Sequence, residues 1–199
     1  MRKASDSSVV TELEVGVWTH LDLRVASAAY NESTCSLCIS RNDSFRLMPD
    51  ADYLYACDER WWKHHLEAVK ATFKGKLYTQ WRGDGDKRFA AENGIEAVQG
   101  AHSAGLGRDK LHFGSNSGYQ AINLAYLLGA TRIILLGYDM GATGNTHWFG
   151  DHPKGMSNGN YQSYVSQFDR LATDLKAEGV EVINCTRQTA LYQFERAAI

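Results

Sequence analysis

Apolar positions along the chain alternate between short runs rich in β-branched or aromatic residues and longer stretches with helical spacing. In the first half, segment 52–57 predicts a strand, and segment 58–73 predicts a helix because its apolar residues recur every three or four positions. Asp58 is a suitable N-cap for that helix, and Gly75 ends it. Two further strands are predicted by short runs over 76–81 and 95–99.

The clearest unit lies in the middle of the chain. Ser115 or Ser117 can cap a helix that runs to Leu128, and Gly129 ends it. The apolar run 131–136 contains β-branched residues and has the character of a central parallel strand that is covered on both faces. A helix followed directly by such a strand is typical of an α/β protein.

The last third continues the alternation after a long polar loop over 137–158. The pattern predicts a helix to about residue 178, a strand over 180–184 and a last helix over 189–195. The chain therefore predicts a doubly wound, mainly parallel α/β sheet of the Rossmann type, with helices on both faces. Ligands bind to such sheets outside the carboxyl ends of the strands.

Length and composition fit one soluble domain over residues 1–199. The first 35 residues are hard to assign, with short strand candidates over 15–18 and 21–26. The hydrophobic share of 44% and the charged share of 22% are ordinary for globular proteins, and a net charge of −2 argues against general nucleic-acid binding. The longest apolar run, 133–136, is far too short to span a bilayer, and the first residues lack the apolar core of a signal peptide. We therefore expect a cytoplasmic protein without membrane contact, and a homo-oligomer is left open.

Two residue pairs have the spacing of metal ligands. Cys35 and Cys38 match a zinc or redox pair, but no second ligand pair accompanies them, so free thiols are expected. Asp84 and Asp86 resemble the acidic pair by which many nucleotide-sugar transferases hold a divalent cation. They lie among several basic residues, and a charged turn is the simpler interpretation. We therefore predict no resident metal.

Three polar segments are candidates for ligand binding. Segment 114–118 precedes a helix, where free backbone N–H groups can bind an anion, although a tight loop with an N-cap explains the same residues. Tyr138 and Asp139 follow the buried strand, so they are expected at the ligand-binding edge of the sheet, where Asp139 can instead cap a turn. The third segment, 145–152, is dense in hydrogen-bonding groups.

The two histidines of this third segment have several interpretations. His147 and His152 can serve as a general base, as metal ligands together with Asp151, or as structural hydrogen-bonding groups. Trp148 lies between them and is a candidate substrate contact. Loops of this length are often functional.

Four stretches carry a resemblance to a known family. They are Asn-Asp-Ser-Phe-Arg-Leu at 42–47, the stretch 51–62 with its paired tryptophans, the stretch 112–139, and Thr-His-Trp-Phe-Gly-Asp-His-Pro at 146–153. On these stretches, residues 40–199 resemble a family of phage and prophage proteins related to bacterial sialyltransferases and, more distantly, to archaeal hydroxymethylpterin diphosphokinases.

The resemblance implies a metal-independent glycosyltransferase that uses a nucleotide sugar and an unknown hydroxyl acceptor. It implies that His147 or His152 is the base and that Asp139 supports the site. The nucleotide contacts that the resemblance implies are Asn42, Asn116, Ser117 and Gly118. Ser115, Tyr138 and Trp148 are further substrate-binding candidates because of their places in the three polar segments. A phage-encoded enzyme of this kind would work in the host cytoplasm.

One departure from the family leaves other functions open. Relatives carry a Gly-x-Gly-Pro-Ser or Ser-Gly-Pro-Ser loop that cradles the nucleotide, whereas segment 25–36 has neither glycine nor proline. Glycine supplies positive φ angles at low cost, so the same phosphate cradle is not expected here. The alternatives are a diphosphokinase-like phosphoryl transferase that needs Mg²⁺, and a non-catalytic nucleotide-binding or virion-associated protein.

Overall fold

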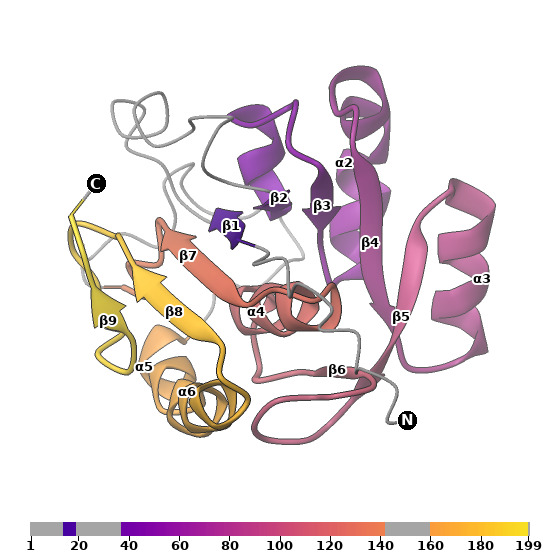
Figure 1. The fold of residues 1–199 in the computed structure, drawn as a ribbon. Coiled ribbons are helices and arrows are strands. Elements are labelled where there is room, and N and C mark those ends of the chain that lie inside the picture. The colour runs from indigo at the N-terminus through magenta and orange to yellow at the C-terminus, as the bar shows by residue number, and fades with distance from the viewer. Residues whose placement is uncertain (1–13, 19–36, 142–159, 199) are drawn as a thin grey trace, which may run out of the picture.

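The computed structural model describes residues 14–18, 37–141 and 160–198 (Figure 1). Their strands form one nine-stranded sheet, in which neighbours pair in parallel. The spatial order is β6-β5-β4-β3-β2-β1-β7-β8-β9. The bounds are β1 Glu14–Trp18, β2 Leu37–Arg41, β3 Tyr53–Tyr55, β4 Lys76–Trp81, β5 Glu96–Ala101, β6 Leu111–His112, β7 Arg132–Leu136, β8 Glu181–Asn184 and β9 Glu195–Arg196. The expected α/β Rossmann-like fold is confirmed.

The strand order reverses at β1. From β1 the chain adds strands outward on one side as far as β6, and then returns to place β7 on the opposite side of β1. The return passes through helix α4, Ser117–Leu127, which packs against β1, β2 and β6. In an open parallel sheet, the crevice at such a reversal is the usual place for a ligand. The topology therefore directs attention to the carboxyl ends of β1, β2 and β7.

Helices cover both faces of the sheet, and each face has its own apolar core. Successive residues of β7 show this directly: Ile133 and Leu135 belong to one core, whereas Ile134 and Leu136 pack in the other. The first core is covered by α4, α5 and α6, and the second by α2, α3 and the short 3₁₀ helix η1. The bounds are η1 Asn42–Arg46, α2 Glu59–Thr72, α3 Asp84–Asn93, α5 Tyr161–Val165 and α6 Phe168–Ala177.

Local signals in the first half explain α2 and its end. The Asp58 side chain accepts a hydrogen bond from the Arg60 N–H, as the predicted N-cap should. Gly75 lies where the backbone of the preceding loop passes close by, because a Cβ there would come within 2.3 Å of the carbonyl oxygens of Ala51 and Asp52. Glycine is therefore required at this position by close backbone contact.

Four sequence-based expectations need correction. The charged turn at 84–86 is the first turn of α3, which the sequence pattern missed because Ala90 is its only buried residue. The helix expected to run to about residue 178 is split into α5 and α6. The N-cap of α4 is Asn116, whose side chain accepts from the Tyr119 N–H, and is neither of the two serines.

The fourth correction concerns the C-terminal segment, where a helix was expected over 189–195. The chain is instead non-helical and ends in β9. The Thr189 hydroxyl donates to the carbonyl of Tyr138, and the Ala190 N–H donates to the carbonyl of Asp139. Bonds to the end of β7 thus hold this segment, with Leu191 and Phe194 buried in the first core. The expected strand over 21–26 and the polar loop over 142–158 lie outside the described residues.

Two glycine substitutions test this account of the backbone. Gly75→Ala should lower the free energy of unfolding by about 1–3 kcal/mol, because its methyl group has no space beside the Ala51 and Asp52 carbonyls. Gly85→Ala, inside α3, meets nothing within 4 Å and should raise stability by up to about 1 kcal/mol through helix propensity. Urea unfolding of both variants and the parent measures the difference. Equal effects at the two positions would contradict the close-contact explanation.

Candidate functional site

The end of β2 and the first turn of α4 meet at the carboxyl edge of the sheet. The Arg41 guanidinium donates through Nη1 to the Ser117 hydroxyl at 3.3 Å, and the Asn42 amide donates to the same oxygen at 3.3 Å. Ser117 lies 76 positions after Arg41 and 75 positions after Asn42 in the sequence. The sheet reversal therefore brings a cation, an amide and a helix N-terminus to one point.

The end of β7 reaches the same point from the other side of β1. The Tyr138 hydroxyl donates to the carbonyl of Gly118 at 3.0 Å, and its backbone N–H donates to the Thr186 hydroxyl at 2.9 Å. Burial raises the pKa of the Tyr138 phenol well above its usual value, an effect that the charge of Arg41 opposes. Tyr138 is thus a neutral, buried contact between β7 and α4.

Asp139 is mostly buried at this edge, with 7% of its surface exposed. Its carboxylate accepts a hydrogen bond from the Gly141 N–H at 3.3 Å, which is the turn-capping role that the sequence left open. Its charge also acts on Tyr161, whose pKa is raised to about 12, chiefly by burial, while Arg41 opposes the rise. The charges of Arg41 and Asp139 thus both influence the pKa of the Tyr161 phenol.

The segment that precedes α4 is held by its own hydrogen bonds. Asn116 accepts from the Tyr119 N–H at 2.8 Å and donates to the Gly114 carbonyl at 2.9 Å. Gln120 donates to the Phe113 carbonyl and accepts from the Tyr55 hydroxyl. The Asn116 side chain therefore caps α4 and holds the preceding turn.

Left-handed backbone conformations gather around this point. Within the described residues, three non-glycine residues have positive φ angles: Asn42 at 46°, Ser115 at 61° and Met140 at 50°. They follow β2, precede α4 and follow β7, respectively. Such conformations cost free energy and cluster where the surrounding structure has a functional reason to hold them.

We call the group Arg41, Asn42, Ser117, Gly118, Tyr138 and Asp139 the switch-point site. Arg41 contributes the positive charge of this site, and that charge acts on Cys57 as well as on the two tyrosines. The Arg41 Nε is buried and has no hydrogen-bond partner in the part of the chain that the structure describes. A guanidinium presents its donors in a planar fork that suits the oxygens of a phosphate or carboxylate.

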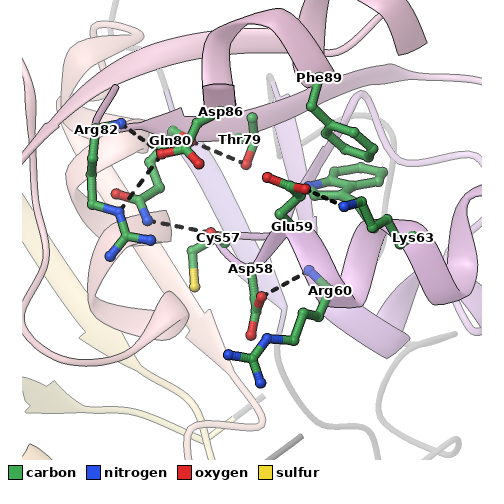
Figure 2. Close-up of a pocket in the computed structure, with 11 residues that line it drawn as sticks. Cys57, Asp58, Glu59, Arg60, Lys63, Thr79, Gln80, Arg82, Asp86 and Phe89 are labelled. Carbon is green, nitrogen blue, oxygen red and sulfur yellow. Dashed lines mark hydrogen bonds and ion pairs between the residues drawn. The ribbon is translucent and has the colours of Figure 1, made fainter. Parts of the chain in front are cut away.

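Cys57 connects the switch-point site to a neighbouring pocket. Burial raises the pKa of its thiol above the usual range, and the nearby Ser117 hydroxyl opposes that rise. Cys57 also lines a cavity of about 350 Å³ between the ends of β3 and β4 and the N-termini of α2 and α3 (Figure 2). We call this cavity the β3–β4 pocket.

Charged and polar side chains form the rim of the β3–β4 pocket. Arg82 and Asp86 are paired, since the Asp86 carboxylate accepts from the Arg82 N–H at 2.9 Å and lies 3.8 Å from its Nε. Lys63 pairs with Glu59 at 2.5 Å. Gln80, from β4, donates to the Cys57 carbonyl at 3.3 Å. In Figure 2 these side chains lie around one hollow, with Phe89 near Lys63. The buried Trp62 also lines the pocket.

The sequence singled out part of this arrangement and missed the rest. Asn42, Ser117, Gly118, Tyr138 and Asp139 are brought together as expected for one edge of the sheet. Ser115 and Asn116 lie beside them in the turn before α4. The catalytic candidates His147 and His152, with Trp148, lie outside the described residues.

Arg41, Cys57 and the β3–β4 pocket were not identified from sequence. Their common signal is position, because Arg41, Cys57 and Arg82 each end or follow a parallel strand at its carboxyl end. Asp86, considered as a metal ligand, instead binds the Arg82 backbone. Within residues 14–18, 37–141 and 160–198, no group of three His, Cys, Asp or Glu side chains is arranged to hold a metal ion.

No protein-family model matches the chain, and no curated protein matches it. None of the helices in the described residues has both the length and the apolar character needed to cross a bilayer. The function of this chain is therefore inferred from the geometry of the switch-point site and the adjoining pocket.

Proposed function

We propose that this chain is a transferase that binds a nucleotide-activated donor, of which a nucleotide sugar is favoured, at the switch-point site. One observation carries the proposal: the Arg41 guanidinium, the Asn42 amide and the first turn of α4 converge on the Ser117 hydroxyl at the carboxyl edge of the sheet. Parallel sheets of this topology bind ligands at that edge.

The chemistry of the site suits an anionic group such as a phosphate. Arg41 supplies a positive charge, and the N-terminus of α4 adds the partial positive charge of an eleven-residue helix. Asn42 and Ser117 add neutral hydrogen-bonding groups that can orient a ribose or a phosphate oxygen. Tyr138, bonded to Gly118, fixes the position of that helix end relative to β7.

Transfer requires a base for the acceptor hydroxyl. In the proposed reaction, His147 or His152 accepts the hydroxyl proton while a bond forms between the acceptor oxygen and the anomeric carbon. The bond from that carbon to the nucleotide phosphate oxygen breaks, and its electron pair leaves with the nucleotide. Asp139 would support the site electrostatically, and the proposed reaction requires no resident metal.

A second candidate is a nucleotide-binding protein without transferase activity. The specific observation in its favour is the absence of any glycine between Gly16 and Gly75, which removes the glycine-containing phosphate loop of the resembled family. The switch-point site would then bind a nucleotide without turnover. The diphosphokinase alternative differs from both in requiring Mg²⁺ to bridge the phosphates.

The binding part of the proposal is tested by removing the Arg41 charge. Calorimetric titration with nucleoside monophosphates and nucleotide sugars, with and without Mg²⁺, should show binding that Arg41→Ala weakens about tenfold to a hundredfold, because one charge-assisted hydrogen bond is lost. Arg41→Lys should recover part of the affinity. Arg88→Ala, on the exposed surface of α3, is the matched control and should bind as the parent does.

Two results would count against this assignment. Equal nucleotide affinities for the parent and for Arg41→Ala would show that the phosphate does not bind at the switch-point site. If the parent protein binds none of these nucleotides, nucleotide binding as a whole is rejected. Thermal unfolding of each variant, without ligand, checks that the affinity change does not come from lost structure.

The catalytic part is tested by replacing the two histidines separately. For whichever nucleotide sugar binds, His147→Ala or His152→Ala should reduce turnover by about a hundredfold or more while leaving the affinity for the nucleotide nearly unchanged, because general-base catalysis acts on the transfer step. Product formation is measured by mass spectrometry. Full turnover by the double variant would exclude both histidines as the base.

A further inference from the structure

The β3–β4 pocket is a second hollow on the same edge of the sheet, and its chemistry differs from that of the switch-point site. Its volume of about 350 Å³ is at the lower end of the range for small-molecule pockets, which is roughly 300–1,000 Å³. Its walls come from two strand ends and two helix starts (Figure 2). Four elements of regular structure thus fix its shape.

Opposite charges are balanced along the lining. Three cations face three anions: Arg60, Lys63 and Arg82 against Asp58, Glu59 and Asp86. A carboxylate already lies at each of the two helix N-termini that adjoin the pocket. Asp58 caps α2, and Asp86 accepts a hydrogen bond from the Arg82 N–H beside the start of α3. A free anion would therefore find little net attraction here.

Hydrogen-bonding capacity, in contrast, is abundant and of both kinds. Guanidinium and ammonium groups offer donors, while the carboxylates keep lone pairs beyond those used in their ion pairs. Gln80, only 7% exposed, donates to the Cys57 carbonyl, and its Oε1 has no hydrogen-bond partner among the described residues. Buried polar groups left without a partner are uncommon in native structures and call for a completing ligand or water.

We propose that the β3–β4 pocket binds an uncharged, polyhydroxylated molecule, a saccharide. Vicinal hydroxyl groups both donate and accept, so they match paired carboxylates and guanidinium groups better than an anion does. Phe89, partly buried at the edge of the pocket with the Lys63 ammonium 5.6 Å from its ring centroid, adds apolar surface that the carbon-bound face of a sugar can contact.

The position of the β3–β4 pocket indicates the role that a bound saccharide would have. Cys57 lines the pocket, and Ser117 is close enough to influence the pKa of its thiol, so the pocket adjoins the point where the donor is proposed to bind. A saccharide bound here would place a hydroxyl group beside the activated donor and act as its acceptor. This role rests on the proposed function, whereas binding of the saccharide does not.

Backbone amide chemical shifts of the full chain test the proposal. The probes are the methyl glycosides of glucose, galactose, mannose and N-acetylglucosamine, each added to millimolar concentration, with inorganic phosphate as a separate arm. At least one glycoside should shift the amides of residues 57–63 and 79–86. Phosphate should leave these amides unchanged.

Variants of the rim sharpen the test. Arg60→Ala and Arg82→Ala should each weaken binding of that glycoside about tenfold, since each removes a charged hydrogen-bond donor. Arg88→Ala, exposed on α3 and outside the pocket, is the matched control and should leave the affinity unchanged. The same spectra show whether each variant is folded.

Three outcomes would overturn the proposal. They are no shift in these segments with any of the four glycosides, shifts with phosphate alone, and equal weakening by the Arg88 control. Nucleotide binding at residues 41–42 and 116–119 is measured separately in the same spectra. Saccharide binding without nucleotide binding would reject the proposed function alone, and the reverse would reject this inference alone.

Discussion

The first turn of α4 lies across the carboxyl ends of β2 and β7, and the whole candidate site depends on that contact. Arg41 and Asn42 bind its Ser117 hydroxyl from one side, and the Tyr138 hydroxyl binds its Gly118 carbonyl from the other. These bonds join segments far apart in sequence, so they exist only because the chain returns from β6 to place β7 beside β1. The topology of the sheet therefore determines the geometry of the site.

Burial makes this contact rigid. Tyr138 and Gln120 are almost fully buried, and Gln120 bonds both the Tyr55 hydroxyl and the Phe113 carbonyl. Buried polar networks with satisfied partners specify one arrangement more strongly than apolar packing alone. The positive φ angles of Asn42, Ser115 and Met140 are held by this surrounding structure.

The sequence predicted the sheet and one edge of the site because those features have strong local signals. An apolar run such as 131–136 has few alternatives to a buried strand, and Asp58 before an amphipathic segment is an unambiguous helix start. Asp139 was placed at the ligand edge because it follows that strand directly.

Features that depend on tertiary contacts could not be predicted in the same way. Helix α3 buries only Ala90 and so has little periodicity, and the segment over 189–195 is held by bonds to the end of β7 rather than by its own propensity. The β3–β4 pocket requires two strand ends and two helix starts to meet. A local sequence pattern does not predict which distant elements come together in this way.

We propose that a nucleotide binds where the strand order of the sheet reverses. Hydrogen exchange, followed by mass spectrometry with and without a bound nucleotide, tests this claim most directly because it reports on every segment at once. With a nucleotide bound, exchange should be slower in peptides that cover residues 37–42, 114–120 and 137–141. Slower exchange confined to β8 and β9, or to no part of the chain, would contradict it.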